Sequence, residues 1–193
     1  MKEIYKKMWQ LALPYYKKGR PGDVEHIKWM IKESIKVSKK ESIDDSILLP
    51  LIILHDIGYA ETKKDNPFKI NLRKEHMKKG AIIATQILKK INYPKNKSKR
   101  IIYFISVHDN WALKKYKIYK THKLLGIFND LDYMWMFTPK GFNIVRKFKK
   151  FSQKEMIVFL EKNSFPEKGF CSSKTTETNH KRYMQKIIES VKT

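Results

Sequence analysis

The segment from Ile47 to Leu54 constrains the chain most, because eight apolar residues run directly into a histidine and an aspartate, His55-Asp56. A run of eight residues is too short to cross a bilayer, so we expect a helix buried inside a folded domain. That helix carries an imidazole and a carboxylate into the interior, where an unpaired carboxylate is far more costly than in water. A divalent cation would satisfy both groups, although His55 and Asp56 can also pair with each other or with backbone.

The ends of this helix can also be predicted from the sequence. Asp44, Asp45 or Ser46 can accept hydrogen bonds at its start, and Gly58 is expected to supply a positive φ where the helix ends. Pro50 removes a backbone donor, so the helix should start late or kink there.

Helical periodicity continues along the chain, and no stretch alternates like a strand. The pattern predicts an all-α helical bundle forming a single domain over residues 1–193, with a core at about 20–137 and C-terminal helices at about 139–193 packing on it. Residues 59–72 read as a loop. The helices are expected at residues 2–18, 23–40 with Asp23 as N-cap, 73–91, 95–108, a segment capped by Thr121, 139–150, 152–162, and a last helix that follows a loop through Ser173 and ends near Val191.

Four further polar residues of the metal-ligand type fall on or beside the apolar faces of these helices. His76 and His108 occupy core-facing positions in their helices, and His26 lies on the edge of its apolar stripe. In the segment after Thr121, Asp132 is expected to be the buried acid, whereas Asp130 should point away. Burying these groups together with His55 and Asp56 without a shared partner would violate the rule that buried polar groups are satisfied. The set therefore predicts a metal site.

The formal net charge of +23 attracts polyanions in general. Only five of the 42 basic residues are arginine, however, and arginine is the preferred reader of phosphates and base edges. The spread of lysines indicates solvated faces and compositional bias, which argues against a dedicated nucleic-acid role. A small anionic substrate is compatible with this charge.

Other bulk features limit the class of protein. Residues 1–10 lack the long apolar stretch of a secretory signal. The single cysteine, Cys171, excludes an internal disulfide framework. The sequence therefore favours a soluble cytoplasmic protein without a membrane segment, and it carries no signal for a particular oligomeric state.

The ordered motifs resemble the HD-domain superfamily of metal-dependent phosphohydrolases. The resemblance runs from Gly22-Asp23-x-x-His26, through Ile53-Leu54-His55-Asp56-Ile57-Gly58, to Asp132 within Asn129 to Trp135. It implies that His26, His55, Asp56 and Asp132 bind one divalent transition metal, which for such ligands is Mn, Fe or Zn, with Mg as a further option.

The same resemblance implies roles for the remaining histidines. His76 and His108 would bind a second metal or the substrate phosphate, so that Asp56, His76 and His108 form the catalytic set. A metal-bound water would then attack a phosphate ester of a nucleotide or another small phosphorylated metabolite. The flanking cations Arg73, Lys79, Lys174 and Arg182 are expected to be mainly solvated surface charges. The chain lacks the signature motifs of the cyclic-dinucleotide and alarmone subfamilies.

Two other functions compete with this one. The same His/Asp order resembles the di-iron oxygenase branch of the superfamily, as in inositol oxygenase, which would need two irons and dioxygen. The chain could instead be a non-catalytic module that binds RNA or an acidic protein through its basic surface.

Overall fold

A computed structural model describes residues 2–62, 65–163 and 171–192. Every regular element in these residues is helical, which confirms the all-α prediction. No helix among them is both long enough and apolar enough to cross a membrane. The elements in order are α1 (Glu3–Lys18), α2 (Asp23–Glu41), α3 (Asp45–Leu54), η1 (Ile57–Glu61), α4 (Ile70–Lys90), α5 (Lys95–Val107), η2 (Asn110–Leu113), α6 (Lys117–Thr121), α7 (Lys123–Met134), η3 (Trp135–Phe137), α8 (Pro139–Lys149), α9 (Gln153–Asn163) and α10 (Lys174–Lys192).

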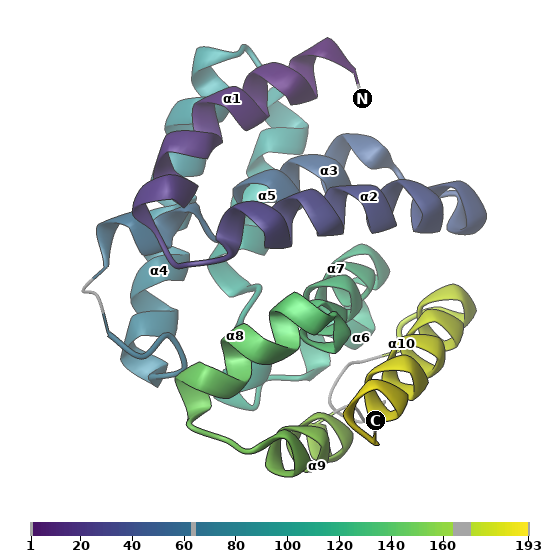
Figure 1. The fold of residues 1–193 in the computed structure, drawn as a ribbon. Coiled ribbons are helices and arrows are strands. Elements are labelled where there is room, and N and C mark those ends of the chain that lie inside the picture. The colour runs from purple at the N-terminus through teal and green to yellow at the C-terminus, as the bar shows by residue number, and fades with distance from the viewer. Residues whose placement is uncertain (1, 63–64, 164–170, 193) are drawn as a thin grey trace.

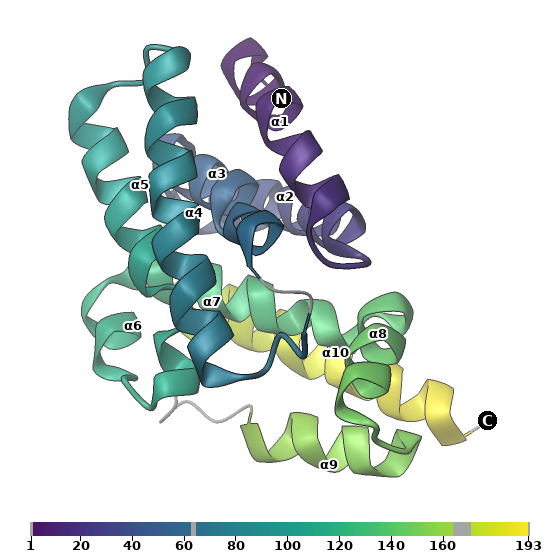
Figure 2. The ribbon, with the colours of Figure 1, turned by 90° about the vertical axis from the view of Figure 1, so that its left-hand side faces the viewer.

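The helices pack around α3, whose residues Ile47 to Leu54 are all buried. Helices α1, α2, α5 and α7 contact α3 directly. Figures 1 and 2 show α1–α3 on one side of the molecule and α8–α10 on the other, with α7 between them. Because α3 is surrounded, its C-terminal end opens into the middle of the protein rather than into solvent. The residues that follow it are therefore delivered into the interior.

The apolar helix begins at Asp45, with Asp44 as its cap, so it does not start late as Pro50 suggested. The Asp44 carboxylate accepts a hydrogen bond from the Ser46 N–H at 2.9 Å. Pro50 has no N–H to give to the Ser46 carbonyl one turn earlier. The Tyr93 hydroxyl donates to that carbonyl instead, at 2.6 Å, so a side chain from the α4–α5 connection replaces the missing helical bond.

Gly58 does not have the positive φ that was expected of it. Gly22, not Gly58, is the described glycine with a positive φ, at 90°. Gly58 lies in η1, where a Cβ would come within 2.0 Å of the His76 carbonyl oxygen and 2.5 Å of the Gly80 nitrogen. Gly80 in turn lies against the backbone of His55 and Gly58. The two glycines let α4 approach the His-Asp segment closely, as expected of Gly80.

Several boundaries differ from the expectations. The region 59–72 is not all loop, since η1 extends to Glu61 and α4 starts at Ile70; residues 63 and 64 lie outside the described residues. Asp23 is not the N-cap of α2, because Gly22 holds that place and the Asp23 carboxylate binds Arg20. Thr121 does not cap α7, because its hydroxyl donates back to carbonyls within α6. Short polar side chains often choose such local backbone partners.

The last helix, α10, contacts α2 and α7. Most of the expected loop before it, residues 164–170, lies outside the described residues. The backbone N–H of Ser172 donates to the Asp130 carboxylate at 2.7 Å, so Asp130 is buried at 3% exposure. The expectation that Asp132 is the buried acid was therefore wrong. Asp132 is only partly buried, with 19% of its side chain exposed, whereas Asp130 points away from the His/Asp cluster and is buried by the start of the C-terminal segment. Burial raises the pKa of Asp130 to about 7, although hydrogen bonds from Thr176 and Ser172 oppose the shift.

Candidate metal centre

The helix ends bring the six expected ligand-type residues into one cluster. His26 lies in the first turn of α2, His55 and Asp56 follow α3, and His76 is in the second turn of α4. His108 follows α5, and Asp132 lies in the last turn of α7. His55, His76 and His108 are at most 1% exposed, and Asp132 is the most accessible member, with 19% of its side chain exposed. Residues 106 positions apart in the sequence thus meet in the interior, and we call these six side chains the centre.

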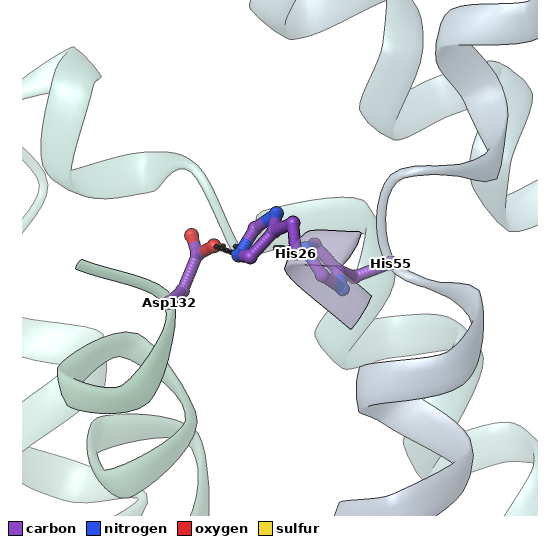
Figure 3. A group of neighbouring side chains, drawn as sticks. All are labelled: His26, His55 and Asp132. Atoms are coloured by element: carbon purple, nitrogen blue, oxygen red, sulfur yellow. Dashed lines mark ion pairs between the residues drawn. The ribbon is translucent and has the colours of Figure 1, made fainter. Parts of the chain in front are cut away.

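One half of the centre consists of His26, His55 and Asp132 (Figure 3). The Asp132 Oδ1 atom lies 3.0 Å from His26 Nε2 and 3.6 Å from His55 Nε2. Both of these buried Nε2 atoms lack a hydrogen bond of acceptable geometry to any described residue. Ligand atoms that lie this close without bonding one another are arranged as they would be around a shared cation, since neighbouring ligands of a transition metal are about 3 Å apart at metal–ligand distances near 2.1 Å.

The other half consists of His76 and His108, whose Nε2 atoms lie 3.1 Å apart. The Asp56 carboxylate connects the two halves. Its Oδ1 atom is 3.4 Å from His76 Nε2 and 3.5 Å from His108 Nε2, whereas its Oδ2 atom is 3.2 Å from His55 Nε2. One carboxylate therefore presents one oxygen to each half, which is the arrangement of a bridging ligand.

Backbone carbonyls fix the protonation pattern of three of the imidazoles. The Nδ1 atoms of His55, His76 and His108 lie 3.0, 3.3 and 2.8 Å from the carbonyl oxygens of residues 52, 72 and 105. A carbonyl oxygen can only accept, so each Nδ1 carries the hydrogen and each neutral ring has its lone pair on Nε2. Histidine ligands of metals are oriented by this kind of bond. In the His76–His108 pair the two lone pairs face each other, and a proton or a cation between them is required.

Two arginines that sequence reasoning did not place in the site hold carboxylates at its edge. Arg20 donates to Asp56 and to Asp23, and Arg73 lies 2.6 Å from Asp109. Arg73 is only 6% exposed, so its interpretation as a surface charge was wrong. Lys79 pairs with Glu75, and Lys174 and Arg182 are exposed, as expected of surface cations.

Asp23 and Asp109 were also missed as parts of the site. Asp109 follows His108 directly, just as Asp56 follows His55, and this second His-Asp pair was the signal that could have identified it. For the arginines the signal was their rarity, since two of only five lie here.

Tyr59 packs between Arg20 and His76 at the edge of the centre. The Arg20 guanidinium carbon lies 3.8 Å from the centre of the Tyr59 ring, and the His76 ring stacks on it at 3.9 Å with planes 12° apart. Two groups that close to one ring centre cannot share a face, so Tyr59 is sandwiched between them. Its ring thereby sets the position of an arginine that binds Asp56 and of a histidine that faces the same carboxylate.

The electrostatics of the centre differ between its halves. Burial alone would lower the pKa of His55, but the Asp56 and Asp132 carboxylates outweigh it and raise the pKa to about 10. Despite its own burial, Asp56 has a pKa well below the usual range because Arg20 and His55 lie beside it. For His76, burial prevails over the nearby carboxylates and lowers the pKa.

The formal charges around the centre do not balance. Four carboxylates lie there, those of Asp23, Asp56, Asp109 and Asp132, against two guanidinium groups. Two negative charges are left for protonated histidines or a divalent cation to neutralise. Nitrogen and carboxylate oxygen donors suit Mn, Fe or Zn, so the buried His/Asp groups could hold such an ion.

Part of the centre borders a pocket of about 710 Å³, measured out to open solvent. His26, Asp56 and Asp132 line this pocket, and so do Arg20 and Arg73. The cluster is buried but reachable, as a site that acts on a ligand must be.

A scan against protein-family models finds no match, and searches of the curated proteins and of the solved structures find none either.

Proposed function

We propose that the chain is a metal-dependent phosphohydrolase of the HD-domain type, which hydrolyses a phosphate ester of a nucleotide or another small phosphorylated metabolite. The observation that carries the proposal is the Asp56 carboxylate, which lies between two histidine groups whose Nε2 lone pairs converge on it. A carboxylate in this position can act as a metal ligand when a cation is bound by at least one of the two histidine groups. The pocket that Asp56 lines together with Arg20 and Arg73 supplies the place for an anionic substrate.

The residues divide the chemistry among them. His26, His55, Asp56 and Asp132 would hold the ion, and a bound divalent ion lowers the pKa of a water ligand and polarises a phosphoryl oxygen. Arg20 and Arg73 stabilise negative charge that develops on the phosphoryl oxygens, with guanidinium groups already held in place by carboxylates. The His76–His108 pair, when it shares a proton across its 3.1 Å separation, is placed to protonate the leaving oxygen. His76 and His108 are also the residues that would hold a second ion.

The test compares a proposed ligand with His180, a partly buried histidine outside the centre. Wild type, His55→Gln and His180→Gln are purified, their metal content is measured, and phosphate release is followed over nucleotides and small phosphorylated metabolites with Mn, Fe or Zn. We expect metal binding and hydrolysis in wild type and His180→Gln, and loss of both in a folded His55→Gln. Equal hydrolysis in His55→Gln would overturn the proposal. Two bound irons, with oxygen consumption on an unphosphorylated polyol and no phosphate release, would favour the oxygenase reading instead.

A further inference from the structure

Two kinds of side chain line the pocket. Carboxylates and an imidazole of the centre line it together with aromatic and aliphatic side chains of η2, η3 and α8, which we call the apolar wall and which include Trp111, Met136, Ile144 and Phe148. Ile144 reaches over Gly22, where a Cβ would come within 2.4 Å of its Cδ1 atom. The apolar wall therefore closes directly over the start of α2, which carries His26.

Positive charge is scarce in this pocket for a chain with net charge +23. Among the described residues that line it, no lysine occurs, and the cations are Arg20 and Arg73. Each already neutralises a carboxylate, Asp56 and Asp109 respectively. A chain of several phosphates would place charged oxygens against the apolar wall, where they would lose hydration without gaining a partner.

We infer, resting on the proposed function, that the substrate is a phosphate monoester of an alcohol with an aromatic or bulky apolar group, and that polyphosphates are excluded. The phosphoryl group meets the centre and the arginines, and the organic group packs on the wall formed by Trp111, Ile144 and Phe148. An aromatic ring suits such a wall because it buries a large apolar area in few rotamers. In the reaction, an oxygen of water bonds to phosphorus as the ester P–O bond breaks. The alcohol leaves with one proton, and phosphate retains the other.

The inference is tested with full-length protein loaded with Mn and three substrates: benzyl phosphate, glycerol 3-phosphate and ATP. Benzyl phosphate and glycerol 3-phosphate release alkyl alcohols of similar reactivity. A difference in kcat/KM between them therefore measures the contribution of contacts between the organic group and the apolar wall. We expect benzyl phosphate to exceed glycerol 3-phosphate by about 10–100-fold, the range that apolar pocket contacts provide, and ATP to release no phosphate. A preference for ATP or glycerol 3-phosphate would overturn the inference.

A pair of variants at one half-exposed wall position sharpens the test. Phe148→Leu keeps the wall apolar, whereas Phe148→Lys adds the missing cation. We expect Phe148→Leu to keep the order of substrates and Phe148→Lys to reduce or reverse it, with metal content unchanged in both. An unchanged order in Phe148→Lys would contradict the role of the wall.

Binding distinguishes failure of this inference from failure of the proposed function. Calorimetry with phenylphosphonate and tripolyphosphate needs no hydrolysis. Tighter binding of phenylphosphonate than of tripolyphosphate, without turnover of any ester, would support the inferred ligand class and contradict the proposed phosphohydrolase activity. Tighter binding of tripolyphosphate, or binding of neither, would reject the ligand class whatever the turnover.

Discussion

Two regions of the molecule contain polar side chains that are fully or largely buried, and the two regions satisfy them differently. At the attachment of α10, the Glu41 carboxylate accepts from the Thr175 N–H at 3.2 Å and pairs with Lys123 at 3.3 Å. The Asp130 carboxylate likewise accepts from a backbone N–H. In the centre, histidine nitrogens instead face carboxylate oxygens and one another without complete hydrogen bonding.

This difference shows what each region is for. At the α10 attachment the carboxylates find hydrogen-bond donors within the chain and act as structure, although Asp130 Oδ1 and His180 Nε2 have no hydrogen-bond partner among the described residues. The centre leaves two negative charges and several converging lone pairs, so it requires an added cation or protons. A reagent that supplies a cation should therefore stabilise the centre and leave the α10 attachment unaffected.

The largest effect is expected from Asp56→Asn. The asparagine amide is neutral and has one carbonyl oxygen, so it cannot present a charged oxygen to each half of the centre. We therefore expect metal affinity to fall by more than about 100-fold and hydrolysis to be lost. Added Mn should raise the Tm of wild type by binding the folded state and should leave the Tm of the variant unchanged. The matched control is Asp65→Asn, an exposed carboxylate paired with Lys69, which should behave as wild type. Equal Mn stabilisation of Asp56→Asn would contradict the bridging role.

A smaller loss is expected from His76→Gln or His108→Gln. These side chains face Asp56 Oδ1, whereas His55 faces Asp56 Oδ2. Elemental analysis should show about one metal equivalent fewer than wild type where the wild type binds two. If wild type binds one metal ion, the variants should bind one as well. In that case the limb of the pH–rate profile that reports the general acid should shift in the variants. Loss of all metal from either variant would show that the two halves are not separable.

The fold class and the members of the centre could be predicted because both depend on local periodicity. His76 and His108 sit at helical spacings on apolar stripes, so their inward direction follows from the sequence. Contacts between distant segments could not be predicted this way. Arg73 lies on the same helix as His76, yet its burial depends on Asp109 and Trp111 from beyond α5. Asp130 is buried only because residue 172 returns to cover it.

Tyr59 tests whether the centre also depends on stacking. Tyr59→Phe keeps the ring, whereas Tyr59→Leu removes the surface that holds Arg20 and His76. We expect the Leu variant to lose about 1–3 kcal/mol of unfolding free energy and to lower kcat more than it raises KM. The Phe variant should be close to wild type, since the hydroxyl makes only a 3.4 Å contact with the Pro67 carbonyl. If both variants had the same kcat at full metal loading, Tyr59 would contribute to packing only and would not position Arg20 and His76 for the reaction.

The smallest effect is expected at the α10 attachment, and it depends on pH rather than on metal. Hydrogen bonds from Thr175 and Ser173, together with Lys123, lower the pKa of Glu41 to about 2, although burial opposes them. Because the folded-state pKa lies below the unfolded value, the stabilisation is fully present above about pH 4.5 and is lost as pH falls toward 2. With 13% of the side chain exposed, its contribution is about 1–2 kcal/mol. Urea unfolding should therefore show Glu41→Gln less stable than wild type at pH 7, with a gap that narrows steadily below pH 4. Added Mn should leave that gap unchanged, and a gap that followed the metal instead would mean that the α10 attachment and the centre are coupled.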